Sequence, residues 1–138
     1  TVRSRRALAV ITSDIDFFKK INDKYGHHTG DLVIKDFTDR ASRELRLPDS
    51  FARFGGEEFV ILLPETGLAE ACQVAERIRC EIEKRRNKDL PAYTVSLGVA
   101  VMQKPDSEQL GNPVEALIAV ADAALYRAKE GGRNRVES

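Results

Sequence analysis

The sequence has few cysteines, no excess of either charge and no long apolar run. Its two cysteines, Cys72 and Cys80, form no CxxC pair and lie in one predicted helix, too far apart for a disulfide. Reduced thiols are typical of the cytoplasm. Lysine plus arginine equals aspartate plus glutamate at 22 each, so no overall field favours nucleic acid or an anionic membrane. No apolar run approaches a membrane span, and no signal peptide is recognised. We therefore expect a cytoplasmic domain with a small-molecule partner.

Two common nucleotide-binding motifs are also absent. The chain has no GxxxxGK[ST] and no GxGxxG after a predicted strand, which argues against a P-loop protein and a dinucleotide-binding fold. His27 and His28 are adjacent and lack further His or Cys ligands, a pattern more typical of an exposed loop than of a zinc site. The 138 residues suffice for one domain with its own core, and residues 1–6 look like the start of a domain excised from a longer protein.

A predicted β-hairpin is the most informative stretch. Phe51 to Phe54 and Phe59 to Leu63 are apolar, aromatic-rich runs that flank Gly55-Gly56, a pattern typical of two strands joined by a tight turn. Glu57-Glu58 follows the turn directly, although adjacent carboxylates repel and have poor strand propensity. A bound cation would resolve this conflict. The alternative is that one Glu faces solvent and the other pairs with a residue such as Arg53.

Hydrophobic periodicity predicts the elements around the hairpin. A buried strand from Ala7 to Ser13 ends in Asp14-Ile15-Asp16, where Asp16 can cap a helix that ends at Gly26. A second helix begins near Asp31 and buries residues as far as Leu45. After the hairpin we expect a helix with an apolar stripe from Leu68 to Ile82, a strand from Tyr93 to Met102, a helix from Asn112-Pro113 to Gly131-Gly132 and a short edge strand at Asn134 to Val136. The order βααββαβα(β) predicts an α+β fold with a ferredoxin-like antiparallel central sheet flanked by helices.

In such a sheet the first strand and the hairpin can be neighbours. Asp14 would then approach Glu57 and bring three or four carboxyl oxygens to one point. Oxygen-only ligation selects a hard cation such as Mg²⁺, and two such ions can clamp a phosphoryl group and acidify an attacking hydroxyl. The backbone N–H groups of Phe17 and Phe18, at a helix N-terminus, would suit a polyphosphate.

Lys129 and Arg133, at the far end of the last helix, can add positive charge to this site. The structural alternative is that Lys129 only complements a helix C-terminus and that Asp16 only caps a helix. Taken one at a time, these residues leave both interpretations open.

Seven motifs follow one another in a single register from about Ala7 to Val136. They are Asp14 to Lys19, Asn22-Asp23, Tyr25 to His27, Gly30-Asp31, Arg53 to Phe59, Ser96 to Ala100, and Ala121 to Asn134. Together they resemble the successive signatures of the GGDEF domain, the diguanylate cyclase family, in its Gly-Gly-Glu-Glu-Phe form. Several independent motifs in the right order are far more specific than any one of them. With this coverage we expect residues 1–138 to form a single, N-terminally truncated GGDEF domain, and the resemblance implies a nucleotidyl-cyclase palm-type version of the predicted sheet.

The resemblance implies a reaction of bacterial second-messenger signalling, in which two GTP molecules condense to cyclic di-GMP and two pyrophosphates. Each domain would hold one GTP with two Mg²⁺ ions, for which Mn²⁺ can substitute. Two domains would face each other antiparallel, so that each 3′-hydroxyl attacks the α-phosphate of the other GTP. Catalysis would therefore need a homodimer, driven by an upstream sensory or dimerisation domain of a parent protein that can be membrane-anchored.

The resemblance also implies roles for individual residues. Asp14, the Ile15 carbonyl and Glu57 would be metal ligands, and Glu57 or Glu58 would assist deprotonation of the 3′-hydroxyl. Substrate would be bound by the backbone of Phe17, Phe18, Gly55 and Gly56, by Asn22 and Asp31 at the guanine edge, and by Lys19, Lys129 and Arg133 at the β- and γ-phosphates.

Arg46-Leu47-Pro48-Asp49, shortly before the hairpin, matches the RxxD motif through which product inhibits this family. Arg46 could fork onto the phosphate or guanine O6/N7 of cyclic di-GMP while Asp49 accepts from guanine N–H. Arg77, on the next helix, can supply a second contact. From spacing alone, a surface Arg–Asp pair around a proline turn remains the alternative; within the matched register, the motif favours an inhibitory site.

Two departures from the family pattern stand out. The usual opening segment, Asp-x-Leu-Thr-Gly-Leu-x-Asn-Arg-Arg, is missing, and only Arg5-Arg6 resembles its tail. Ser13 stands where the family usually has an apolar strand residue. Two alternatives to an active cyclase remain open: a receptor for cyclic di-GMP or sensor of GTP that keeps the Arg46 and Asp49 site, and a cyclase with another base preference. The intact hairpin motif favours the enzyme.

Overall fold

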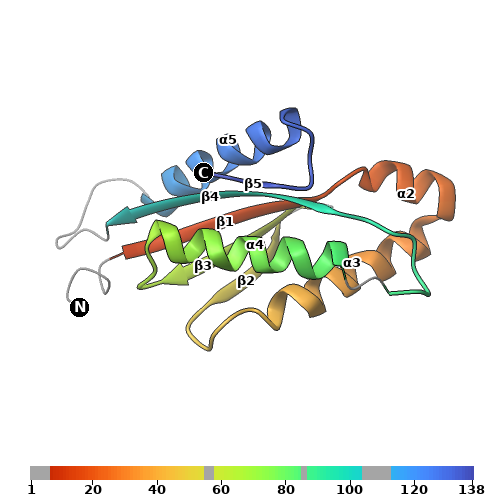
Figure 1. Ribbon diagram of the computed structural model, residues 1–138, viewed down its shortest axis with the longest axis horizontal. Coiled ribbons are helices and arrows are strands. Elements are labelled where there is room, and N and C mark those ends of the chain that lie inside the picture. Colours follow the sequence, from red (N-terminus) through yellow and green to blue (C-terminus); the bar gives the residue numbers. More distant parts are fainter. Residues whose placement is uncertain (1–6, 55–57, 85–86, 104–112) are drawn as a thin grey trace.

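The computed structural model describes residues 7–54, 58–84, 87–103 and 113–138. The elements follow the predicted order, as Figure 1 shows. They are β1 (Ala7–Ile15), α2 (Phe18–Tyr25), α3 (His27–Ser42), β2 (Ser50–Phe54), β3 (Glu58–Pro64), α4 (Leu68–Lys84), β4 (Val95–Gln103), α5 (Pro113–Glu130) and β5 (Val136–Glu137). Among the described helices, none combines the length and apolar character needed to cross a membrane.

A five-stranded sheet in the order β2-β3-β1-β4-β5 forms the centre of the fold. β1 is antiparallel to both of its neighbours, β3 and β4, and β2 completes the predicted hairpin with β3. The α+β fold is therefore confirmed. β5 differs from a purely antiparallel sheet because it pairs parallel with β4. Since α5 carries the chain back along the sheet before β5 begins, the edge strand arrives in the same direction as β4.

The two faces of the sheet are covered unequally (Figure 1). On one face, α2, α3 and α4 cover the larger core, to which β1 contributes Ala9 and Ile11. On the other face α5 covers a smaller cluster that contains Val10. This alternation follows from the two-residue period of a strand. Within the larger core, the ring of Phe59 lies 4.9 Å from that of Phe37, centroid to centroid, which anchors β3 next to Glu58.

The helix boundaries correct three details of the sequence prediction. α3 begins at His27 rather than near Asp31, because Gly26, with φ 94°, makes the turn between α2 and α3 by itself. α3 ends at Ser42, so Leu45 packs against the core from beyond the helix rather than from its buried face. Leu68, at the first turn of α4, is 48% exposed instead of buried, whereas the unpredicted Val74 is buried.

Ser13 lies in the larger core, opposite Phe59 of β3 and Leu97 of β4. It is fully buried, and its hydroxyl has no hydrogen-bond partner among the residues that the structure describes. The fold thus accommodates a serine at the position where the sequence comparison with the family expects an apolar side chain.

Gly98 of β4 allows α5 to approach the sheet closely. A Cβ at this position would lie 2.2 Å from the carbonyl oxygen of Ala121 and 2.3 Å from the backbone nitrogen of Leu125. These are backbone atoms of α5, so they cannot move aside without displacing the helix. The distance between α5 and β4 is therefore set by the absence of a side chain at Gly98.

Gly98→Ala should lower the free energy of unfolding by about 3 kcal/mol, because the new methyl group forces α5 away from the sheet. Urea unfolding measures this loss. Gly67→Ala is the matched control, since a Cβ at Gly67 meets no atom within 4 Å. In Gly67→Ala the free energy of unfolding should fall by no more than about 1 kcal/mol, because alanine is a poorer N-cap residue than glycine. Equal losses for the two variants would contradict the close packing of α5 on β4.

Candidate active site

The end of β1 places a buried carboxylate between two neighbouring strands. Asp14 is paired in register with Glu58 of β3 and with Ser96 of β4. Directly opposed residues of antiparallel strands point to the same face, so Asp14 and Glu58 share the face that α5 covers. Asp14 is only 7% exposed. Its Oδ2 accepts a hydrogen bond from the Nζ of Lys129, which joins the end of β1 to the C-terminal turn of α5.

Glu58 faces a second carboxylate from α5. Burial, a hydrogen bond shared with Asp122, and the negative charges of Asp122 and Asp14 raise the pKa of Glu58 to about 7, while Lys129 opposes this effect. At neutral pH, Glu58 is thus partly protonated. A carboxyl group that titrates near neutrality is typical of catalytic sites. A positive charge placed beside Glu58 would favour its ionised form.

The donor set at this point fits a hard cation. Asp14 Oδ1 is buried and has no hydrogen-bond partner among the described residues, whereas its Oδ2 is taken by Lys129. A buried carboxylate oxygen without a partner is costly unless something else binds it, and Mg²⁺ prefers such oxygens. Within the described ranges, no three His, Cys, Asp or Glu side chains could complete a metal site by themselves.

The predicted hairpin residues Gly55, Gly56 and Glu57 lie outside the described residues. The predicted metal set of Asp14, the Ile15 carbonyl and Glu57 therefore stays a prediction. What the structure adds is the register between Asp14 and Glu58, so the first residue of β3, itself a carboxylate, stands beside the end of β1.

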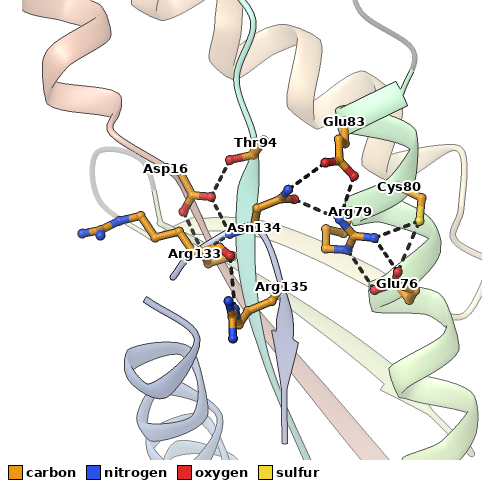
Figure 2. A network of polar contacts seen from close by, with 10 residues as sticks. Asp16, Glu76, Arg79, Cys80, Glu83, Thr94, Arg133, Asn134 and Arg135 are labelled. Atoms are coloured by element: carbon orange, nitrogen blue, oxygen red, sulfur yellow. Dashed lines mark hydrogen bonds and ion pairs between the residues drawn. The ribbon is translucent and has the colours of Figure 1, made fainter. Parts of the chain in front are cut away.

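Asp16 does not cap α2, which corrects one sequence interpretation. The residue at the N-cap of α2 is Phe17, in the left-handed region at φ 56°, and no side chain among the described residues caps the helix. Asp16 is 3% exposed, and its carboxylate accepts hydrogen bonds from Thr94 Oγ1 at 2.7 Å and Ser96 Oγ at 2.6 Å. The backbone N–H of Asn134 donates a third at 3.0 Å (Figure 2). Asp16 therefore joins β1, β4 and the chain after α5.

The groups predicted to meet phosphates gather at this end of the sheet. Phe17, which is 53% exposed, precedes the N-terminus of α2. The guanidinium of Arg133 lies 4.7 Å from the centroid of the Phe17 ring. Lys129, in the last turn of α5, reaches Asp14. Lys19 is exposed on the first turn of α2. The contact between Arg133 and Phe17 thus brings one side-chain cation to the start of α2, where backbone N–H groups suit an anion.

Asn22 and Asp31, the predicted guanine-binding pair, come from adjacent helices that pack on each other. Asn22 is half-buried on α2, and its Oδ1 has no partner among the described residues. A Cβ on Gly30 of α3 would lie 1.8 Å from this Oδ1, so only glycine leaves room for the amide. Asp31 follows Gly30 and is exposed. Phe18 packs its ring into the core, which leaves only its backbone for a ligand.

The RxxD residues lie away from Asp14. Ser50, directly after Asp49, pairs with Leu62, whereas Glu58 lies four residues back along β3 at the other end of the hairpin. At about 3.3 Å per residue, the two places are about 13 Å apart along the strand.

Arg46 and Asp49 contact each other across the turn that precedes β2. The Asp49 Oδ2 accepts a hydrogen bond from the backbone N–H of Arg46 at 2.8 Å, and the guanidinium of Arg46 lies 3.8 Å from the same oxygen. Arg46 also pairs with Glu70 of α4, and Arg77, two turns further along α4, pairs with Glu44. The side chains of Arg46 and Arg77 are about half exposed, so a ligand could reach them by displacing Glu70 and Glu44, whereas the Asp49 side chain is only 2% exposed.

Two residues of this site received no role from the sequence. Asp122 contacts Glu58, and the only signal was its position seven residues before Lys129, two helical turns along the same side of α5. Asn134 contacts Asp16, and nothing in its spacing predicted this contact, since the two residues are joined only by folding.

Comparisons with known proteins give consistent results. The family model described as diguanylate cyclase, GGDEF domain, matches residues 1–135. YhcK of Bacillus subtilis, an uncharacterized protein, is 46% identical over 132 residues, which is 93% of this chain and 35% of YhcK. Diguanylate cyclase DosC of Escherichia coli is 40% identical over 140 residues, 98% of this chain and 29% of DosC. The chain thus spans about a third of the length of these curated relatives. The crystal structure of the GGDEF domain of DgcB from Caulobacter crescentus, in complex with c-di-GMP, has a TM-score of 0.81 and 37% identity and covers 95% of this chain and 77% of that one.

The raised pKa of Glu58 predicts a pH-dependent stability. A carboxyl whose pKa is higher in the folded than in the unfolded state stabilises the fold at low pH, and this contribution is lost as pH rises through about 7. Glu58→Gln should therefore flatten the fall in unfolding free energy between about pH 5 and about pH 8. Urea unfolding at both pH values measures this change. Glu130→Gln, which changes an exposed carboxyl of α5, should leave the wild-type slope intact. An unchanged slope in Glu58→Gln would show that Glu58 titrates normally.

Proposed function

This chain belongs to the GGDEF domain family, and on that premise we propose that it is a diguanylate cyclase domain that condenses two GTP molecules into cyclic di-GMP and two pyrophosphates. The observation that carries the proposal is the buried Oδ1 of Asp14, beside Glu58 and Lys129, which has no partner in the part of the chain that the structure describes. Such an oxygen, in a carboxylate next to Lys129 of α5, suits a metal ion that is itself bound to a polyphosphate.

Each residue has a definite part in this proposal. Asp14, the Ile15 carbonyl and Glu57 would hold Mg²⁺ or Mn²⁺, which when bound neutralises phosphate charge and acidifies the 3′-hydroxyl. Lys129 would exchange its contact with Asp14 for the β- and γ-phosphates, and Lys19 and Arg133 would join it there. Asn22 and Asp31 would read the guanine edge with their amide and carboxylate groups.

Proton transfer would fall to the carboxylates of the hairpin. The bond formed joins the 3′-oxygen of one GTP to the α-phosphorus of the other, and the bond broken joins that phosphorus to the oxygen that leaves with pyrophosphate. The 3′-proton must go to a base. Glu58, with a pKa of about 7, can accept a proton at neutral pH, and Glu57 is the second candidate for this role.

The proposal includes a second copy of the chain. One set of guanine-binding and phosphate-binding residues can hold only one GTP, so a second domain must supply the other. We therefore propose an antiparallel homodimer. The longer curated relatives are consistent with a parent protein in which another domain, sensory or dimerising, brings two cytoplasmic copies together.

The decisive assay uses the chain fused to a dimerising coiled coil and incubated with labelled GTP and Mg²⁺. Chromatography should show cyclic di-GMP, and Glu57→Ala should reduce its formation by at least about a thousandfold, since both metal binding and proton transfer are lost. Glu130→Ala, on the exposed side of α5, is the control and should retain activity. Tight binding of cyclic di-GMP without turnover would instead identify a receptor, and a product from another nucleotide would identify a cyclase of different base preference.

We also propose that Arg46, Asp49 and Arg77 bind cyclic di-GMP and inhibit the enzyme. Arg46→Ala should raise the concentration of cyclic di-GMP needed for half-inhibition at least about tenfold, because charge-assisted hydrogen bonds are lost. Arg43→Ala removes an exposed arginine from the same segment and should leave inhibition unchanged. Inhibition that is equally strong in Arg46→Ala would remove this site from the proposal.

A further inference from the structure

The turn after α5 holds an unusual backbone conformation. Arg133 and Asn134 are consecutive residues in the left-handed region, with φ of 64° and 48°. Asparagine tolerates this region, but arginine adopts it rarely, so the turn persists only if surrounding contacts hold it. The N–H of Arg133 donates to the carbonyl of Ala128 at 2.9 Å, which ties the turn back to α5.

Asn134 is held from two sides (Figure 2). Its backbone N–H donates to Asp16 Oδ2 at 3.0 Å and to Ser96 Oγ at 3.2 Å, both on the sheet side. Its side-chain amide faces α4, where Nδ2 donates to Glu83 at 2.9 Å and Oδ1 accepts from Arg79 at 3.0 Å. The hydrogen bonds from Asn134 and Arg79 lower the pKa of Glu83, which keeps this carboxylate charged.

Asp16 completes the connection on the other side. Its buried carboxylate is used entirely within the fold, by Thr94, Ser96 and Asn134. All three donors are neutral groups of the fold. The next residue, Phe17, carries the ring under the Arg133 guanidinium, 4.7 Å from its centroid. The hydrogen bond from the Asn134 N–H to Asp16 joins the residue after Arg133 to the residue before Phe17. It therefore sets the position of Arg133 relative to the start of α2.

We propose that Asp16 and Asn134 are positioning residues that hold Arg133 against the triphosphate of the bound nucleotide. Neither residue touches the substrate. They act through the backbone of the turn, which directs the Arg133 side chain, and through Phe17, whose backbone begins α2. This inference rests on the proposed function, because it assumes that Arg133 meets the β- and γ-phosphates.

The test measures binding by calorimetry with 3′-deoxyGTP and 3′-deoxyGMP in Mg²⁺, since nucleotides without a 3′-hydroxyl cannot be condensed. Asn134→Ala should weaken binding of 3′-deoxyGTP about tenfold and of 3′-deoxyGMP less than about twofold, because only the β- and γ-phosphate contacts are lost. Both variants keep the backbone N–H, but Asn134→Gly also adopts the left-handed region freely, so its loss should be only about threefold. Asn87→Ala, in the loop before β4, is the matched control and should bind both nucleotides as wild type does.

A double-mutant cycle separates positioning from general destabilisation. In an Arg133→Ala background, Asn134→Ala should change the affinity for 3′-deoxyGTP by less than about twofold, because the residue through which Asn134 acts is gone. Additive losses, or equal losses for both nucleotides, would overturn the inference. If Asn134→Ala does not fold, Asn134→Gly decides by the same two criteria. A wild-type chain that binds neither nucleotide would overturn the proposed function and this inference together, whereas wild-type binding with unaffected variants would overturn this inference alone.

Discussion

The position of β1 between two antiparallel partners is the constraint on which the site depends. Hydrogen bonds on both edges set one register, and this register puts Asp14 opposite Glu58 on one side and Ser96 on the other. A slip by one residue would turn Asp14 toward the core covered by α2, α3 and α4. Because β1 is buried on both faces, that slip would also move Ile11 out of the larger core and Val10 out of the smaller cluster, each to the face where the other now packs. Packing energy in the core thus maintains the geometry of a polar site at the edge.

Asp14 and Asp16, two residues apart, illustrate two ways to bury a carboxylate. Asp16 is satisfied by three neutral donors and serves the fold. Asp14 has one oxygen paired with Lys129 and one without a partner among the described residues, next to Glu58 with its raised pKa. A buried carboxylate oxygen without a partner and a carboxyl with a raised pKa both cost folding free energy, and they are characteristic of functional sites rather than of structural ones. The hydrogen bonds of the two carboxylates therefore distinguish Asp16, which stabilises the fold around the site, from Asp14, which is available to bind a ligand.

The sequence predicted the strands, the hairpin and the element order because each follows from a local period of apolar residues or from a turn residue. It failed where the outcome depended on contacts between distant segments. Leu68 fits a helical stripe but lies at the start of the helix, where the described residues leave it 48% exposed. Asp16 is a residue type that commonly caps helices. Its oxygens instead accept hydrogen bonds from Thr94, Ser96 and the backbone N–H of Asn134. The direction of β5 depended on where α5 returns the chain.

The sequence by itself determined which side chains are available: carboxylates after β1 and at the hairpin, cations at the end of α5, and glycines where elements approach closely. It also indicated the family, since motifs in a fixed order survive without any knowledge of contacts. Only the tertiary structure decided which of these groups meet. Three such pairs are separated by 64 to 118 residues along the chain: Asp14 with Lys129, Glu58 with Asp122, and Asp16 with Asn134. Their interactions are strong only within a few ångströms. The spacing of residues in the sequence does not say which distant segments come that close.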